Sequence, residues 1–461
     1  MHGDACASLA SDIGVATEVR VYEYDQGSYV GLGNHLRLIR RLVENAAGAS
    51  LVTRISFEVP MAADPIAHND SVPAPQGMIY GMETPGDTLL AKIGDVVWPV
   101  CQLVAGNTDD LSAEAVQKEW LVGVELSLIP YLNAVLLVLL PNLASMWVTY
   151  PLELSGPLRA IFDVARVEES YRGRTASWSH PDVLRRSVLD RLEHVGFVND
   201  LGWSLQWRSL EQIAALLSPS AVRTAHVELP IFRYATDLVP QFFLSGLDTL
   251  TINVHRGSTN PSRSLGPLVR NAKSLRKLSI DNLDRSTGRN VLEWDWAAVN
   301  SIIRDACLSL TSLSIAALHS SPLVVPLLPF YSPCRLERLD MYAALLLPCV
   351  SGMQSSTSVV SSLVELPASL EYLVIRCGLP CVGDDLDHAI QEHHTAYNAV
   401  CGLLSQNSLP SFRPSLRAVR MVVHERLVGF PALVRHRQTV ESLCRDRAIT
   451  LSFESFVEIA V

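Results

Sequence analysis

The chain has 461 residues, of which 48% are hydrophobic and 18% are charged. This apolar content is ample for a folded core, which excludes a mostly disordered chain. The formal net charge of −10 disfavours nucleic-acid-binding proteins, because these need a dense basic footprint to neutralise phosphates. We therefore expect no nucleic-acid partner.

The N-terminal residues Met1 to Ala10 have neither the basic residues nor the long apolar stretch of a signal peptide. The nine cysteines are scattered and odd in number, whereas secreted disulfide frameworks are short and cysteine-dense. Both features predict a cytoplasmic or nuclear protein with reduced thiols. Residues 1–17 are expected to form a flexible N-terminus.

A short pattern, apolar-x-x-apolar-x-apolar, recurs along the chain. Its copies begin at Val52, Leu143, Val222, Leu247, Leu275, Leu310, Leu336, Leu370 and Leu416. From Val222 onward the copies are 25 to 46 residues apart, a period typical of solenoids. The alternation that ends each copy predicts a strand with one buried face.

Helical patterns lie between these segments. They cover Asn34–Asn45, Asp182–Val195, Ser209–Leu217, Trp296–Ala306 and Asp387–Ser405, and a closing unit joins a helix at Gln438–Cys444 to a strand at Ile449–Phe453. Such helices supply the crossovers that parallel strands need. The fold class predicted is α/β: a leucine-rich-repeat-like solenoid of irregular helix–strand units over residues 18–461, with a parallel sheet on one face and helices on the other.

The alternative is an ordinary α/β domain with leucine-rich strands. The recurrence of one spacing and the lack of a glycine-rich strand–helix turn favour the solenoid. Polar or Pro/Gly-rich stretches predict loop insertions near residues 60–90, 166–180, 253–264 and 351–362.

The segment Leu126–Val148 is apolar enough to suggest a membrane span. Pro130 and Pro141 interrupt it, whereas a spanning helix needs about 20 predominantly apolar residues. We predict instead a buried helix over Tyr131–Leu140, followed by a strand, and no membrane association.

Three stretches carry a resemblance to a known family. They are His35–Glu44 running into Leu51–Phe57, the "leucines, Pro-Asn-Leu" step at Leu136–Leu143, and the Leu-Pro-x-Ser-Leu-Glu-x-Leu unit at Leu366–Leu373. The chain thereby resembles the fungal F-box/leucine-rich-repeat-like proteins, especially the divergent filamentous-fungal group.

The resemblance implies the substrate-recognition part of an SCF-type ubiquitin ligase. The F-box, which would bind a Skp1-type adaptor, is not found in this chain. The alternative is a stand-alone scaffold with no ligase role. The family's usual Asn or Cys after each strand is out of step here, at Asn282 and Cys377, so the turns are expected to satisfy their backbone groups differently.

Motifs for chemistry are missing from the sequence. It has no phosphate-binding loop, no dinucleotide fingerprint and no nucleophile elbow. Cys377 and Cys381 could form half of a zinc site, but two buried thiols around a turn is the favoured alternative. The acidic and histidine residues of 384–394 could chelate a cation, but a solvated helix start is favoured. We predict no enzyme, no cofactor and no metal.

The residues between the buried strand positions define a projected outward row. It comprises Glu58, Trp147, Thr149, Thr251, Asn253, Ser279, Asp281, Asp340, Tyr342, Arg376 and Arg420. Trp, Tyr and Arg are enriched in binding hot spots, so Trp147, Tyr342, Arg376 and Arg420 are the predicted anchors for a protein partner on the strand-lined face. The alternative is that this face is merely solvated or covered by insertions.

Overall fold

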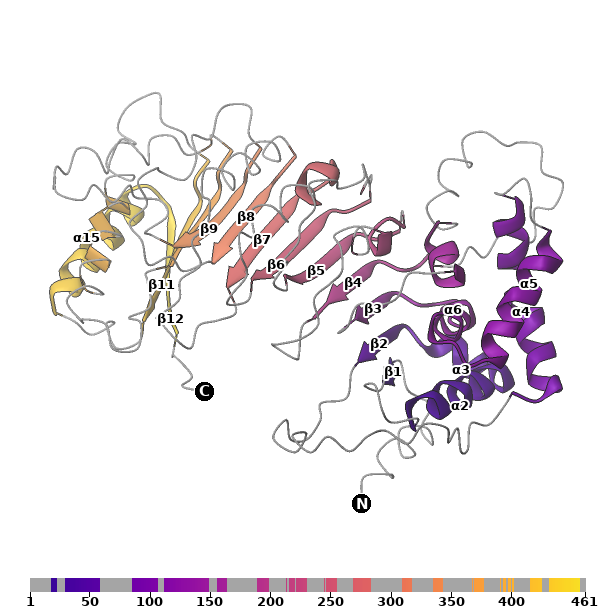
Figure 1. Cartoon of the computed structure of the whole chain (residues 1–461). Coiled ribbons are helices and arrows are strands. Elements are labelled where there is room, and N and C mark those ends of the chain that lie inside the picture. The colour runs from indigo at the N-terminus through magenta and orange to yellow at the C-terminus, as the bar shows by residue number, and fades with distance from the viewer. Residues whose placement is uncertain are drawn as a thin grey trace, which may run out of the picture. The chain divides into compact units, whose positions relative to one another are not determined.

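The computed structural model describes residues 18–22, 30–58, 85–106, 112–148, 156–163, 189–198, 268–282, 309–316, 335–342, 415–424 and 431–456, most of 213–229, 244–254 and 367–376, and several helical residues between 390 and 401 (Figure 1). Twelve strands form a parallel sheet in which the strand order is the chain order. The predicted α/β fold with a parallel sheet is confirmed. The chain divides into two compact units, residues 1–226 with 238–247, and residues 227–237 with 248–461.

The first unit contains four complete strands and five named helices. The strands are β1 (Glu18–Tyr22), β2 (Arg54–Glu58), β3 (Ser145–Val148) and β4 (His194–Phe197). The helices are α2 (Val30–Glu44), α3 (Ala46–Leu51), α4 (Asp87–Gly106), α5 (Ala113–Glu125) and α6 (Ile129–Leu139). The boundary between the units falls within β5 (Thr224–Leu229).

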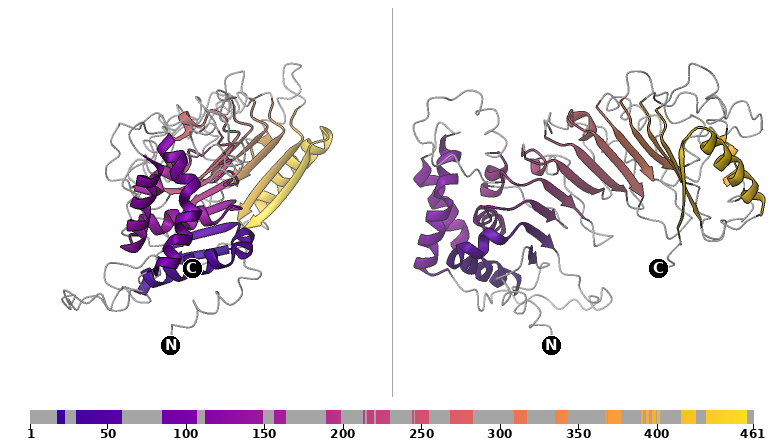
Figure 2. Two further views of the ribbon diagram at one scale, coloured as in Figure 1. Left: turned by 90° about the vertical axis from the view of Figure 1, so that its right-hand side faces the viewer. Right: turned by 180° about the vertical axis from the view of Figure 1, so that it is seen from behind.

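The second unit contains the remaining strands and one named helix. The strands are β6 (Thr249–Val254), β7 (Lys277–Asn282), β8 (Ser312–Ala316), β9 (Arg338–Tyr342), β10 (Tyr372–Arg376), β11 (Ala418–His424) and β12 (Thr450–Phe456). Helix α15 (Pro431–Asp446) connects the last two strands and packs against β12 (Figure 2). The closing helix and strand predicted at residues 438–453 are therefore confirmed.

The recurring pattern explains why these segments are strands. In the second unit the register aligns Leu250, Leu278, Leu313, Leu339, Leu373 and Val419, all of which are buried. The next apolar position aligns in the same way, from Ile252 to Met421. Side chains alternate along a strand, so residues two apart point to the same face of the sheet. The register therefore forms two parallel rows of apolar side chains that run across the strands on the buried face.

A main-chain ladder fixes the turn before most of the strands. The carbonyl of Asp248 accepts hydrogen bonds from two consecutive amides, Arg276 N and Lys277 N, at 2.8 and 2.9 Å. The same double acceptance recurs at Thr53, Ala144 and Glu193 in the first unit and at Arg276, Thr311, Glu337 and Glu371 in the second. These turns satisfy their amides through backbone carbonyls, without a side-chain ladder.

All nine predicted copies of the pattern are strands, and two further strands were missed. Residues 194–197 form β4, and residues 189–191 form a turn, so the helix predicted over Asp182–Val195 is wrong at its C-terminal end. Leu192, Val195 and Phe197 are a further copy of the pattern. It was missed because Leu192 also continues the helical spacing of Leu184 and Val188 in the sequence, and these two residues lie outside the described part of the chain. The other missed strand, β1, has only Val19 and Val21 to mark it.

Two of the predicted loop insertions overlap elements of regular secondary structure at one end. Helix α4 begins at Asp87, so the loop predicted near residues 60–90 does not extend to residue 90. The insertion predicted at 253–264 begins later than expected, because Asn253 and Val254 belong to β6. The predicted flexible residues 1–17, the insertions at 166–180 and 351–362 and the helix at Trp296–Ala306 lie outside the described residues.

Helix α6 is the centre of the first unit's helical layer. It contacts α2, α4 and α5 and buries most of its residues, including Leu132, Val135 and Leu136. The predicted buried helix followed by a strand is confirmed, because α6 leads into β3. Of the described helices, α4 is long and apolar enough to cross a membrane, and α5 and α6 meet that criterion only together, across a bend of 113°.

Candidate interaction surfaces on the strand-lined face

In the first unit, Trp147 lies over a glycine of the neighbouring strand. The register pairs Trp147 on β3 with Gly196 on β4. A Cβ atom on Gly196 would lie 2.2 Å from Trp147 Cε3, far inside van der Waals contact. The indole Nε1 donates a hydrogen bond to Ser145 Oγ at 3.0 Å. Because this bond ties the ring to its own strand, the indole is held over β4.

A guanidinium group and an imidazole ring flank the indole. The Arg54 guanidinium lies 5.0 Å from the indole centroid, and the His226 ring lies 5.7 Å away at an angle of 45°. Arg54 is held in turn by Glu18, with Nε 3.6 Å from Oε1. We call Arg54, Trp147 and His226 the Trp147 platform. A half-buried indole with such neighbours can pack against a proline, aromatic or aliphatic side chain of a partner.

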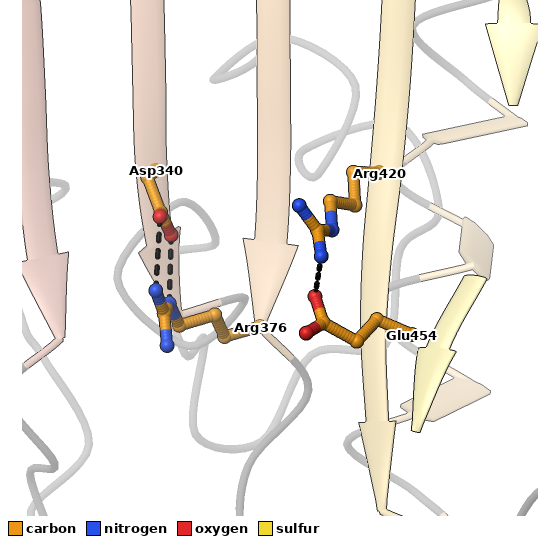
Figure 3. Close-up of polar contacts among 4 residues, drawn as sticks. All are labelled: Asp340, Arg376, Arg420 and Glu454. Atoms are coloured by element: carbon orange, nitrogen blue, oxygen red, sulfur yellow. Dashed lines mark hydrogen bonds and ion pairs between the residues drawn. The ribbon is translucent and has the colours of Figure 1, made fainter. Parts of the chain in front are cut away.

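In the second unit, Arg376 is bound by an acidic residue of the adjacent strand (Figure 3). Arg376 Nε donates to Asp340 Oδ1 at 2.7 Å, and a terminal nitrogen donates to Asp340 Oδ2 at 2.9 Å. The Asp340 residue is only 6% exposed, and the Arg376 side chain is 30% exposed. This bidentate geometry is the strong form of a charge pair. Arg376 is therefore neutralised within the sheet.

Arg420 has a partner of a different kind. It is paired with Glu454 on β12, and both side chains are about half exposed, at 46% and 48% (Figure 3). An exposed pair of this type contributes about 0–1 kcal/mol, so water or a competing carboxylate can replace it. Arg420 is therefore a more available group than Arg376.

The structure divides the four predicted anchors between the two units. Trp147 belongs to the first unit, and Tyr342, Arg376 and Arg420 belong to the second. Tyr342 is the register partner of Arg376 on the neighbouring strand, and Arg420 is that of Val374. Sequence reasoning missed Arg54, Gly196 and His226. Trp147, Gly196 and His226 lie on three successive strands, and this order of a large, an absent and a second aromatic side chain could have indicated that the indole lies over the glycine.

The other residues of the projected row occupy mixed environments. Thr251, Ser279 and Asp281 are half-buried, and Asn253 is buried. Thr149 lies outside the described residues, as do Cys377 and Cys381. The row therefore does not form a uniformly exposed surface.

The histidine-rich segment contributes to packing against α15. His393 is fully buried, and the His394 ring meets the His436 ring edge-on at a centroid distance of 4.6 Å. Burial and the neighbouring His394 lower the pKa of His436. Asp384, Asp385, Asp387, His388 and Glu392 lie outside the described residues. Within the described part of the chain, no three His, Cys, Asp or Glu side chains are grouped to hold a metal ion.

No protein-family model matches this chain, and no curated protein is similar to it.

Proposed function

We propose that the chain is a non-enzymatic protein–protein interaction module, built as a leucine-rich-repeat-like solenoid. The observation that carries this proposal is the parallel sheet whose strands follow one another in chain order, each with the same apolar pattern in the same register. In such an architecture each unit buries its leucines against the units before and after it. The outward positions of successive strands then form an extended array suited to a protein partner.

Within this proposal, Trp147 is the anchor of the first unit, and Tyr342, Arg376 and Arg420 are contact residues of the second. The platform supports the role of Trp147, because Gly196 and Ser145 hold the indole flat before any partner arrives. Preorganised aromatic side chains bind at low entropic cost. Arg420 would exchange Glu454 for a partner's carboxylate, whereas Arg376 would help mainly by keeping the sheet rigid.

The resemblance to fungal F-box/leucine-rich-repeat-like proteins makes the substrate-recognition arm of an SCF-type ubiquitin ligase the leading biological role. The stretches that carry the resemblance coincide with α2 and β2, with α6 and β3, and with β10. A cytoplasmic or nuclear location accompanies this role.

A stand-alone scaffold is the second candidate. An F-box begins near a Leu-Pro pair that opens a helix. Here Leu229 ends β5, and Pro367 accepts the turn hydrogen bond from Leu370 before β10. Such a scaffold would bind its partner without recruiting a ligase.

Affinity purification of the tagged chain from its source cells tests both candidates. The interaction module predicts bound proteins that are reproducibly retained by the wild type and lost on Trp147→Ala, with Arg445→Gln on the exposed side of α15 as a control. The ligase role predicts a Skp1-type adaptor among them, and the scaffold role predicts partners without it. Absence of any specific partner, or a catalytic turnover by the purified chain, would overturn the proposal.

A further inference from the structure

The first residues of four successive strands in the second unit form a separate feature of the strand-lined face. They are Lys277, Ser312, Arg338 and Tyr372, which the register places side by side on β7, β8, β9 and β10. We call these four residues the basic row. Neighbouring strands are about 4.8 Å apart, so the backbones of Lys277 and Arg338 are about 10 Å apart. The predicted anchors are not among these residues.

The two cations of the basic row differ from three arginines of other strand positions. Arg54, Arg376 and Arg420 are each paired with a carboxylate of a neighbouring strand. Lys277 and Arg338 are exposed, and neither side chain has a hydrogen bond or an ion pair within the described part of the chain. Their charges are therefore available to a ligand.

The surroundings of the row leave an excess of positive charge. Glu371 is occupied by Arg417, with Oε1 3.5 Å from the guanidinium nitrogen, and Asp248 lies 3.4 Å from Arg276. The exposed carboxylate of Glu337 precedes Arg338, but the exposed Arg335 stands three residues before Arg338. This local excess contrasts with the net charge of −10 of the whole chain.

The row also offers non-ionic contacts. Tyr372 is 44% exposed and is one of the few large apolar side chains that the described residues leave open. It is the register partner of Arg338. The half-buried Ser312 between the two cations provides a hydroxyl that can donate to a backbone carbonyl.

We propose that the basic row binds an acidic, extended segment of the protein partner, with two carboxylates seated on Lys277 and Arg338. In a polyproline II segment, residues three apart lie on one side and about 9 Å apart, which matches the spacing of the two cations. A proline or aliphatic residue of the segment packs on Tyr372, as such segments do on exposed aromatic rings. This inference rests on the proposed function, because it assigns the chemistry of the partner.

Fluorescence anisotropy with labelled proline-rich peptides tests the row on the full chain. One peptide carries two glutamates three residues apart, a second carries them two residues apart, and a third carries glutamines. We expect the first peptide to bind about tenfold more tightly than the glutamine peptide, and its affinity to fall as salt is raised. Equal binding of these two peptides would overturn the proposal. Preference for the two-residue spacing would overturn the polyproline geometry.

A matched pair of variants identifies the site. Lys277→Gln/Arg338→Gln should lose about tenfold in affinity for the first peptide, and Tyr372→Ser should lose severalfold. The control Arg435→Gln/Arg445→Gln removes the same charge from exposed positions of α15 and should bind like the wild type. Circular dichroism verifies that each variant is folded. If both double variants lose the same affinity for the first peptide, binding depends only on the net charge of the protein, and the proposed site is rejected.

Two competing occupants give contrary results. If the wild type forms dimers and Lys277→Gln/Arg338→Gln is monomeric, the row binds a second copy of the chain. If RNA displaces the peptide and binds with higher affinity, the row binds nucleic acid. Partner capture from cells separates this inference from the proposed function. Partners retained by the double variant would overturn the basic row alone, whereas a wild type that captures none would overturn the function.

Discussion

Trp147 lies across β4 because its register partner, Gly196, has no side chain. The indole occupies the space of a Cβ atom, with Cε3 2.2 Å from where that atom would be. Gly196→Ala must therefore lift the ring or shift the strand. We expect a loss of about 1–3 kcal/mol in the free energy of unfolding, the usual cost of overpacking.

A double-mutant cycle checks this relationship. Trp147→Ala alone removes the platform, and Gly196→Ala in that background should then cost much less, because the clash has gone. Urea unfolding of the four proteins measures the coupling. Additive costs would show that Gly196 is needed for a reason other than the indole.

The two charge pairs of the second unit should differ in their contribution to stability. Asp340→Ala leaves the partly buried Arg376 without its bidentate partner, so we expect a loss toward the low end of roughly 3–5 kcal/mol. Glu454→Ala breaks only the exposed pair with Arg420 and should cost less than about 1 kcal/mol. Denaturant midpoints of the two variants provide the comparison, and similar losses would contradict it.

The histidine contact on α15 predicts a dependence of stability on pH. The pKa of His436 is lowered in the folded protein, so the unfolded chain binds more protons below its ordinary value of 6.5. The contribution of His436 is therefore present above pH 6.5 and is lost as the pH falls from 6.5 toward the lowered value.

Thermal unfolding from pH 7.5 to 5.5 measures this contribution. Wild type should lose more stability over that interval than His436→Gln, which lacks the titrating group. His394→Gln removes one of the two causes of the shift and should lie between them. Identical pH profiles for wild type and His436→Gln would refute the prediction.

Two buried cysteines should resist thiol reagents. Burial raises the pKa of Cys101 to about 12 and that of Cys444 to about 11, and the thiolate is the reactive form. At pH 7.5 both should react with maleimide at least about a hundredfold more slowly in the folded protein than in 6 M guanidinium. Mass spectrometry of tryptic peptides assigns each site, and rapid labelling of Cys444 in the native state would contradict the burial of this residue of α15.

Much of the strand arrangement could be predicted from the sequence, because three apolar positions at fixed spacing are visible without any long-range information. Leu247, Leu250 and Ile252 are an example. The pattern failed for β4, where Leu192 fits helical and strand spacing equally well. The sequence analysis also predicted no helix at α4, whose first residues overlap the end of the insertion predicted near residues 60–90.

The surface was less predictable than the core. The sequence indicated that Trp147 and Arg376 belong to the outward side of their strands, but not what each contacts. The Asp340–Arg376 pair joins residues 36 apart across a diagonal of two strands, a geometry that only the register defines. The basic row was overlooked because the outward row was built only from positions after the second apolar residue of each copy, whereas Lys277 and Arg338 directly precede that residue.

The double-acceptor turns have a consequence for how this chain can change. Eight of the strands are aligned by one carbonyl of the preceding turn, so their alignment does not depend on the length of the connection between the strands. Connections as different in length as residues 317–337 between β8 and β9 and residues 59–144 between β2 and β3 can therefore join equivalent strands. Segments can be grafted into those connections, or trimmed from them, while the exposed side chains of adjacent strands stay in step.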